Sequence, residues 1–93
     1  MAQLMIDYSK IPGSTIETLT AWIEYGRPMG HFCEAIVSND LREACARADE
    51  RNRAALWEIV AWLHNYAPIG SWGSREALEQ WSRMKRGGKR YED

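Results

Sequence analysis

Hydrophobic residues recur at helical spacing along most of the chain, and polar or glycine-containing segments separate these stretches. The apolar positions of the first stretch are Ile16, Leu19, Trp22 and Ile23. Before them, Ser14 and Glu17 form a capping-box pattern, in which each side chain satisfies a free backbone amide. Gly26 after them is typical of a helix end. The pattern predicts a first helix over residues 15–25.

The longest apolar stripe follows Ser38-Asn39-Asp40, three residue types that favour helix starts. Its members are Leu41, Ala44, Cys45, Ala48, Asn52, Leu56, Ile59, Val60 and Leu63. Because no Gly or Pro lies between residues 40 and 66, we expect one long helix over about 40–66. A break near Asp49, with Asp49 capping a second helix, is the alternative.

Two further helices are expected around the long one. The apolar residues of the earlier helix are Met29, Phe32, Cys33, Ile36 and Val37. A loop over residues 67–73 precedes Ser74, which is expected to cap a last helix over residues 75–85. Residues 1–13 suggest an N-terminal arm or one short strand, and residues 86–93 a flexible tail. The chain is therefore predicted to be all-α, a compact single domain of four or five helices.

Composition narrows the classes of partner. With 93 residues the chain has room for one domain. Its 12 basic and 13 acidic residues give a net charge of −1, so a strong positive field for nucleic acid is lacking. No apolar run approaches the roughly 20 residues that span a bilayer. Nucleic acid and membrane are therefore not expected as main partners.

The sequence carries no recognisable catalytic or metal-binding motif. His31, Cys33, Cys45 and His64 lack metal-ligand spacing, and both cysteines are interpreted as reduced core thiols. No nucleophile elbow, phosphate-binding glycine loop or catalytic triad is recognised. We therefore expect neither an enzyme nor a cofactor. Five of the twelve basic residues lie near the C-terminus: Arg83, Lys85, Arg86, Lys89 and Arg90.

Polar residues that interrupt apolar stripes are the candidates for ligand contact. Asn52 falls on the core side of the predicted long helix, beside Asp49. Such a buried amide either bonds to the cap of another helix or to a loop backbone, or it faces a pocket or a subunit interface. Trp72 lies between two glycines just before Ser74, where it either stacks on a planar ligand or closes the end of the bundle.

Large aromatic residues are expected on both flanks of the predicted long helix. Trp57 and His64 share one flank, and Trp62 and Tyr66 share the other. A narrow domain cannot easily bury both flanks, and Trp and Tyr are common interface anchors. These four residues are therefore interface candidates, and a homo-oligomer is expected.

Short motifs spread over residues 26–81 resemble those of a group of small proteins encoded by tailed phages and prophages. The pattern is G-x-F, N-D-L, A-D-x-x-N, a W-G-S turn and a final Trp. The matching residues are Gly30, Phe32, Asn39, Asp40, Leu41, Ala48, Asp49, Asn52, Trp72, Gly73, Ser74 and Trp81. The resemblance implies a phage accessory protein that acts in the bacterial host cytoplasm.

The first hypothesis is a non-catalytic phage protein that counters host defence by binding. It would sequester a small ligand, such as a nucleotide, or block a host protein. In the nucleotide version, Trp72 stacks on the base, Arg27 and Ser74 hold phosphate, and Asp49 or Asn52 contacts base edges; Asn39 and Asp40 complete the candidate site. The alternatives are a protein–protein interaction module with a purely structural polar motif, and a small helical nucleic-acid binder that uses the basic C-terminus.

Overall fold

The computed structural model describes residues 6–87, and this part of the chain is built from helices without strands. The helices are α1 Gly13–Tyr25, α2 His31–Val37, α3 Leu41–Arg47, α4 Glu50–Ala54, α5 Leu56–Tyr66 and α6 Arg75–Ser82. A 3₁₀ turn, η1, covers Tyr8–Lys10, and a π-helical turn, η2, covers Arg83–Gly87. The all-α prediction is therefore confirmed. In the described residues no helix has the length and apolar character needed to cross a bilayer.

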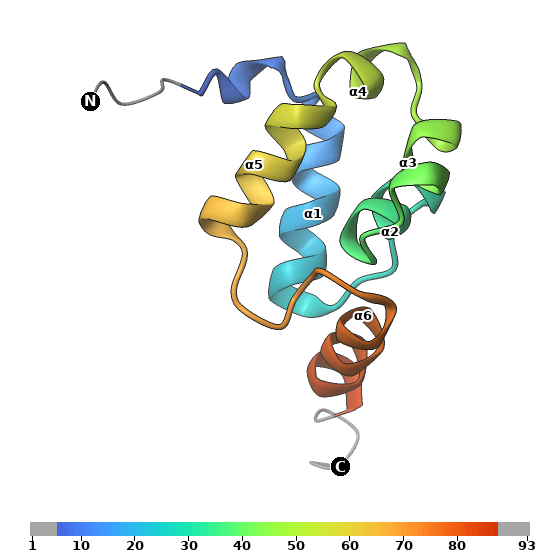
Figure 1. The fold of residues 1–93 in the computed structure, drawn as a ribbon. Coiled ribbons are helices and arrows are strands. Elements are labelled where there is room, and N and C mark those ends of the chain that lie inside the picture. The colour runs from blue at the N-terminus through green and yellow to red at the C-terminus, as the bar shows by residue number, and fades with distance from the viewer. Residues whose placement is uncertain (1–5, 88–93) are drawn as a thin grey trace, which may run out of the picture.

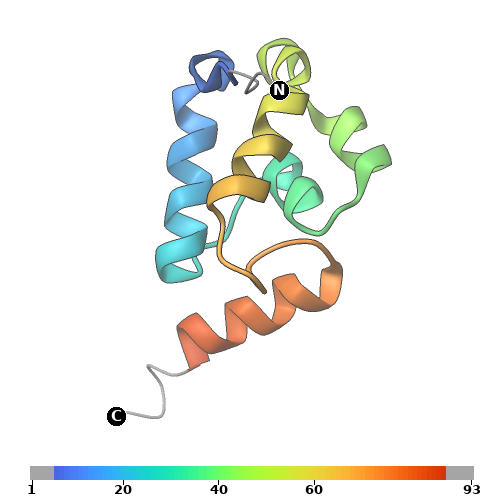
Figure 2. The same ribbon diagram turned by 60° about the vertical axis from the view of Figure 1, so that its left-hand side comes forward.

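The helices enclose one apolar core. In two views α5 lies beside α1, the short helices α2 and α3 lie next to each other and to this pair, and α6 lies across the lower end of the domain (Figures 1 and 2). The largest fully buried hydrophobic side chains of the core are those of Trp22, Leu19, Ile59, Leu63 and Val37. They come from α1, α2 and α5, so these three helices contribute most of the interior.

Helix α1 begins after a proline and ends at a glycine, and each residue suits its place through its backbone conformation. Pro12 is its N-cap residue and makes no side-chain capping bond, so the predicted capping box of Ser14 and Glu17 is wrong. Proline suits this place because it has no N–H to leave unsatisfied. At the other end Gly26 has φ of 69°, a left-handed conformation that favours glycine. The helix end predicted at Gly26 is therefore confirmed.

The predicted long helix over residues 40–66 is wrong, and the alternative with a break at Asp49 is confirmed. The Asp49 side chain caps α4 by accepting a hydrogen bond from the backbone amide of Asn52 at 2.8 Å. The backbone of Ala48, the residue before Asp49, is extended. A second interruption at Ala55 separates α4 from α5. The aspartate side chain competes with the backbone bonds of a continuous helix, because it offers the same amide a local acceptor.

The loss of helical continuity changes which residues of the stripe are buried. Ala44, Ala55 and Ile59 lie in the core, but Leu41 is 66% exposed and Cys45 is exposed too. The interpretation of Cys45 as a core thiol is therefore wrong, while Cys33 is buried as expected. Each break rotates the following helix relative to the preceding one, so a single phase over residues 41–63 does not hold.

The last helix confirms its predicted start and corrects its end. The Ser74 hydroxyl accepts a hydrogen bond from the Ala77 amide at 3.0 Å and caps α6. The α-helical geometry ends at Ser82 rather than at residue 85, and the chain continues as the wider turn η2. Most of the predicted tail, residues 88–93, lies outside the described residues.

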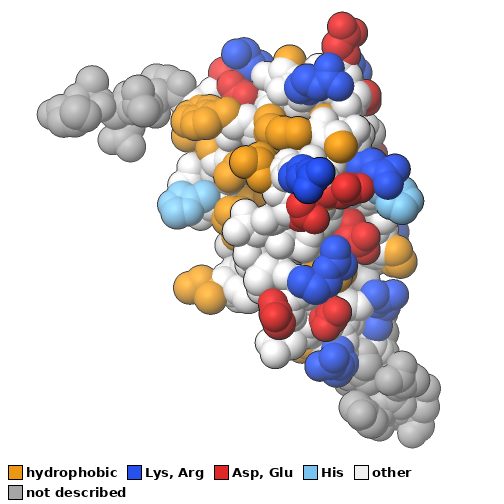
Figure 3. Space-filling view, turned by 45° about the vertical axis from the view of Figure 1, so that its right-hand side comes forward, with side chains coloured by type: hydrophobic (Ala, Val, Ile, Leu, Met, Phe, Trp, Pro, Cys, Tyr) orange, Lys and Arg blue, Asp and Glu red, His pale blue; other side chains and the backbone are white. Residues whose placement is uncertain are grey.

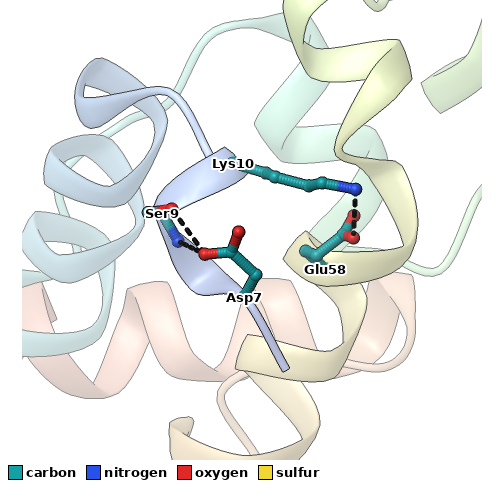
Figure 4. Close-up of polar contacts among 4 residues, drawn as sticks. All are labelled: Asp7, Ser9, Lys10 and Glu58. Carbon is teal, nitrogen blue, oxygen red and sulfur yellow. Dashed lines mark hydrogen bonds and ion pairs between the residues drawn. The ribbon is translucent and has the colours of Figure 1, made fainter. Parts of the chain in front are cut away.

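The described part of the N-terminal arm packs on α5 as a turn. The Asp7 carboxylate accepts hydrogen bonds from the Ser9 hydroxyl and, at 3.1 Å, from the Ser9 amide (Figure 4). These bonds stabilise the charged form and lower the pKa of Asp7. Lys10 pairs with Glu58 of α5 at 3.5 Å. Residues 8–10 therefore form a 3₁₀ turn and no strand.

Candidate functional site

A small groove lies between the α2–α3 pair, α5 and the loop before α6. Its lining residues are Ala35, Ile36, Asn39, Asp40, Leu41, Ala44, Val60 and Trp72. Most of these side chains are apolar, and the polar exceptions are Asn39 and Asp40. The cavity volume is about 40 Å³, far below the roughly 300–1,000 Å³ typical of pockets for drug-sized ligands. The groove therefore has room for one side chain or a few atoms.

The two polar lining residues form the tight turn between α2 and α3. Asn39 has φ of 64°, in the left-handed region that asparagine tolerates better than most residues. The Asp40 amide donates to the Ala35 carbonyl at 2.8 Å, which closes the end of α2. The Asp40 carboxylate accepts from the Glu43 amide at 3.2 Å and caps α3. The N-D-L motif thus has a structural role that places Leu41 at the start of α3.

Trp72 forms one wall of the groove and also packs against the core. The loop that carries it is held in place by the Gly73 amide, which donates to the Val37 carbonyl at 2.7 Å. Next to Trp72, Ser71 is fully buried, and its carbonyl accepts a hydrogen bond from the Trp22 indole at 2.9 Å. The loop therefore closes the end of the bundle while leaving part of Trp72 at the surface.

Asp49 and Asn52 belong to a polar network at a different place. The side-chain oxygen of Asn52, Oδ1, accepts a hydrogen bond from the Thr15 hydroxyl at 2.6 Å. The side-chain nitrogen of Asn52, Nδ2, donates to the Asp49 carboxylate at 3.0 Å. Thr15 is buried on α1, so Asn52 joins α4 to α1. The side-chain amide of Asn52 therefore has partners within the protein, but they are the Thr15 hydroxyl inside α1 and the cap of its own helix rather than the cap of another helix or a loop backbone.

The seven predicted ligand residues are divided among several places. Asn39, Asp40 and Trp72 meet in the groove, and the lining does not include Arg27, Asp49, Asn52 or Ser74. Arg27 is exposed, with its guanidinium 5.1 Å from the centre of the Tyr25 ring. Ser74 caps α6. The groove therefore contains one aromatic wall and one carboxylate but no cation.

The two flanks of α5 differ in their exposure. The Tyr66 ring contacts the Tyr8 ring edge-on at 5.6 Å between centroids, and Asn65 donates to the Tyr8 hydroxyl at 2.8 Å. Trp62 is half-buried against the core. The arm thus partly covers this flank, although Tyr66 remains 63% exposed. On the other flank, Trp57 is 60% exposed and His64 is exposed.

Leu41 and Val60 are site residues, although their place in the apolar stripe predicts that both are buried. Both line the groove, and they are 66% and 38% exposed. Trp57 precedes Val60 by three residues on α5 and so lies on the same side of the helix. We call Leu41, Trp57 and Val60 the apolar rim. Figure 3 shows that hydrophobic side chains gather on one face of the molecule, beside charged side chains of both signs.

The two cysteines differ in burial, and their reactivity therefore tests which residues the fold buries. Burial raises the pKa of the Cys33 thiol from 9.0 to about 11, so its thiolate fraction falls about a hundredfold. Cys45 is exposed. We expect iodoacetamide at mildly alkaline pH to add one rapid carbamidomethyl group, at Cys45, as measured by intact mass. A Cys45→Ser variant should react rapidly only in urea, and rapid modification of Cys33 in the folded protein would contradict this burial.

In residues 6–87, no three His, Cys, Asp or Glu side chains are grouped so that they could hold a metal ion. Comparisons with protein-family models, with curated protein sequences and with solved structures found no match. The features that remain for function are the groove, the apolar rim and the charges around them.

Proposed function

We propose that the protein acts by non-catalytic binding to another protein, and that the partner inserts an apolar side chain into the groove. The exposure of Leu41 carries this proposal, because a leucine at 66% exposure beside a groove leaves apolar area uncovered. Val60 and Trp57 extend the apolar area along α5. An apolar centre with aromatic anchors is the usual composition of the core of a protein interface.

The groove supports a protein partner better than a nucleotide. Its volume of about 40 Å³ fits a side chain, whereas a nucleotide needs several times more space. Phosphate recognition needs cations or free backbone amides, and the lining offers the Asp40 carboxylate instead. Trp72 is packed against the core, which leaves less of its ring available for stacking on a base.

The setting of this function is also a proposal. The resemblance to small proteins of tailed phages and prophages favours an accessory protein that blocks a host protein in the bacterial cytoplasm. Polar residues of that pattern cap helices or join them, and the exposed Leu41 is the pattern member best placed for contact. A second copy of the chain is the other occupant to test, since self-association would cover the same apolar rim.

Affinity capture with two matched variants tests the proposal. In Leu41→Asp the charge enters the rim, and an acidic residue in the first turn of α3 is compatible with the helix dipole. In Ile69→Asp the same change is made at a residue that is 101% exposed and not part of the groove lining. We expect wild type and Ile69→Asp to recover the same partner from host cells. Leu41→Asp should recover about a tenth or less, since a buried unpaired charge costs more than about 1.4 kcal/mol.

The outcome that contradicts the proposal is equal recovery by Leu41→Asp and wild type, with both variants folded by circular dichroism. Sedimentation velocity on the purified protein decides between a partner and a second copy. A dimer that Leu41→Asp dissociates, with no partner captured, would make the chain itself the occupant. A monomer at all concentrations would leave the groove to another protein.

A further inference from the structure

A second surface lies at the end of α1, where the chain turns away and η2 packs against it. The position of a Cβ atom on Gly26 would lie 2.7 Å from Cβ of Lys85 and 3.7 Å from Cγ of Arg86. The backbone at residue 26 therefore touches a segment about sixty residues later in the chain. Arg27 directly follows Gly26, so this contact places it near the neighbouring pair Lys85 and Arg86, although these two residues come almost sixty positions later in the sequence.

Two of these cations are held over aromatic rings. The Arg27 guanidinium lies 5.1 Å from the centre of the Tyr25 ring, and the Lys85 ammonium lies 5.1 Å from that of Trp81. The Trp81 indole is itself fixed, because its N–H donates to the carbonyls of Trp22 and Ile23 at 3.2 Å. Cation–π contacts of this kind restrict long side chains and so reduce the entropy cost of binding.

The same cations lack acidic partners within the described chain. Across residues 6–87, ion pairs join Lys10 to Glu58 and Arg47 to Glu43, and none involves Arg27, Lys85 or Arg86. Two exposed apolar residues accompany them, Tyr25 at 50% and Met84 at 55%. We call Tyr25, Arg27, Met84, Lys85 and Arg86 the basic end.

We propose that the basic end binds a segment of a partner protein that is rich in Asp and Glu. Three cations that have no carboxylate partner among residues 6–87 complement such a segment, and Arg pairs with carboxylates in bidentate fashion. Tyr, Met and Arg are also the residue types enriched in protein interfaces. This inference rests on the proposed function, because it describes the charge of the protein that occupies the groove.

A nucleic acid fits the basic end less well. Stacking of bases needs free aromatic faces, and cations already lie over the rings of Tyr25 and Trp81. The net charge of −1 leaves no extended positive field for a phosphate backbone. The few cations of the basic end can attract the carboxylates of a short peptide segment without such a field.

Fluorescence anisotropy with a labelled glutamate-rich peptide at low salt tests the inference. The test variant is R27Q/K85Q/R86Q, and the control is R42Q/R51Q/R75Q, which removes the same charge from three exposed arginines elsewhere. We expect the control to bind like wild type apart from a small general effect. The test variant should bind the peptide about tenfold more weakly than wild type. Added salt should weaken peptide binding by the wild type. Arg27→Gln alone, which leaves the Lys85–Trp81 contact intact, should show part of the loss.

Two results would overturn the inference. Equal weakening by test and control variants would show that only net charge matters. A labelled oligothymidylate that binds more tightly than the peptide, and loses binding in the test variant, would assign the surface to nucleic acid. The proposed function fails separately: Leu41→Asp should bind the peptide like wild type, so peptide binding at the basic end with equal partner capture by Leu41→Asp would leave this inference standing alone.

Discussion

Replacing Trp22 by alanine will lower the free energy of unfolding by about 3–5 kcal/mol. The side chain is 2% exposed and is the largest among the fully buried ones, and its indole N–H donates to the Ser71 carbonyl at 2.9 Å. The change therefore opens a cavity and leaves a buried carbonyl without its donor. Because domains of this size are stable by only about 5–15 kcal/mol, much of the folding free energy would be lost. Urea denaturation followed by circular dichroism measures the effect.

Two variants separate the causes of this loss. Trp57→Ala makes the same truncation at a residue that is 60% exposed, so we expect a change within about 0.5 kcal/mol. Trp22→Phe keeps most of the apolar area but removes the indole donor, and should cost about 1–3 kcal/mol. Similar losses for Trp22→Ala and Trp57→Ala would contradict the assignment of the core.

Substitution of Gly26 by alanine should cost about 2 kcal/mol or more. A residue with a Cβ atom is disfavoured by about 1–2 kcal/mol at its φ of 69°. The new Cβ would also lie 2.7 Å from Cβ of Lys85, so α1 and η2 must separate. The loss is measured by urea denaturation, and the variant should also bind the glutamate-rich peptide more weakly.

Two other glycines are matched controls for Gly26. Gly70→Ala keeps the strain without the contact, because Gly70 has φ of 94° and no atom within 4 Å of its Cβ position. Gly13→Ala has neither problem and should be neutral or stabilise by up to about 1 kcal/mol. If Gly26→Ala costs no more than Gly70→Ala, the close packing of η2 on α1 is wrong.

Helix existence and several helix ends could be predicted because they depend on local chemistry. The glycine at residue 26, the aspartate at residue 49 and the serine at residue 74 each act within one turn of the backbone. The continuity of residues 40–66 could not be predicted, because a helical stripe and a capping aspartate pointed to different results. In the structure Asp49 caps a new helix, so the stripe is divided among α3, α4 and α5.

The candidate site was predicted in part. Asn39, Asp40 and Trp72 stood out as polar or aromatic interruptions, and the fold brings them to one groove. Leu41 and Val60 carried no signal, because an apolar residue in an apolar stripe is expected to be buried. The basic end was predicted in part: Lys85 and Arg86 belong to the basic C-terminal cluster, but the sequence gives no sign that Arg27 lies near them, because that depends on the contact of Gly26 with η2, two distant segments.

The polar residues around Asn52 stabilise the fold, whereas the apolar rim is available for binding. Asn52 hydrogen-bonds to Asp49 of its own helix cap and to Thr15 of α1, which joins α4 to α1, so loss of these residues should disturb folding before binding. Leu41 and Trp57 contribute little to the core, so their exposure is not explained by stability. Residues that are costly to expose and not needed for the core are typical of binding surfaces.

Hydrogen–deuterium exchange of the protein with and without its captured partner tests the docking surface most directly. We predict that binding will slow exchange in the segments that carry the groove, residues 35–44 and 57–63. The segment around Tyr8, on the covered flank of α5, should remain unchanged. Protection at that flank with no protection of the groove would contradict the assignment of the docking surface.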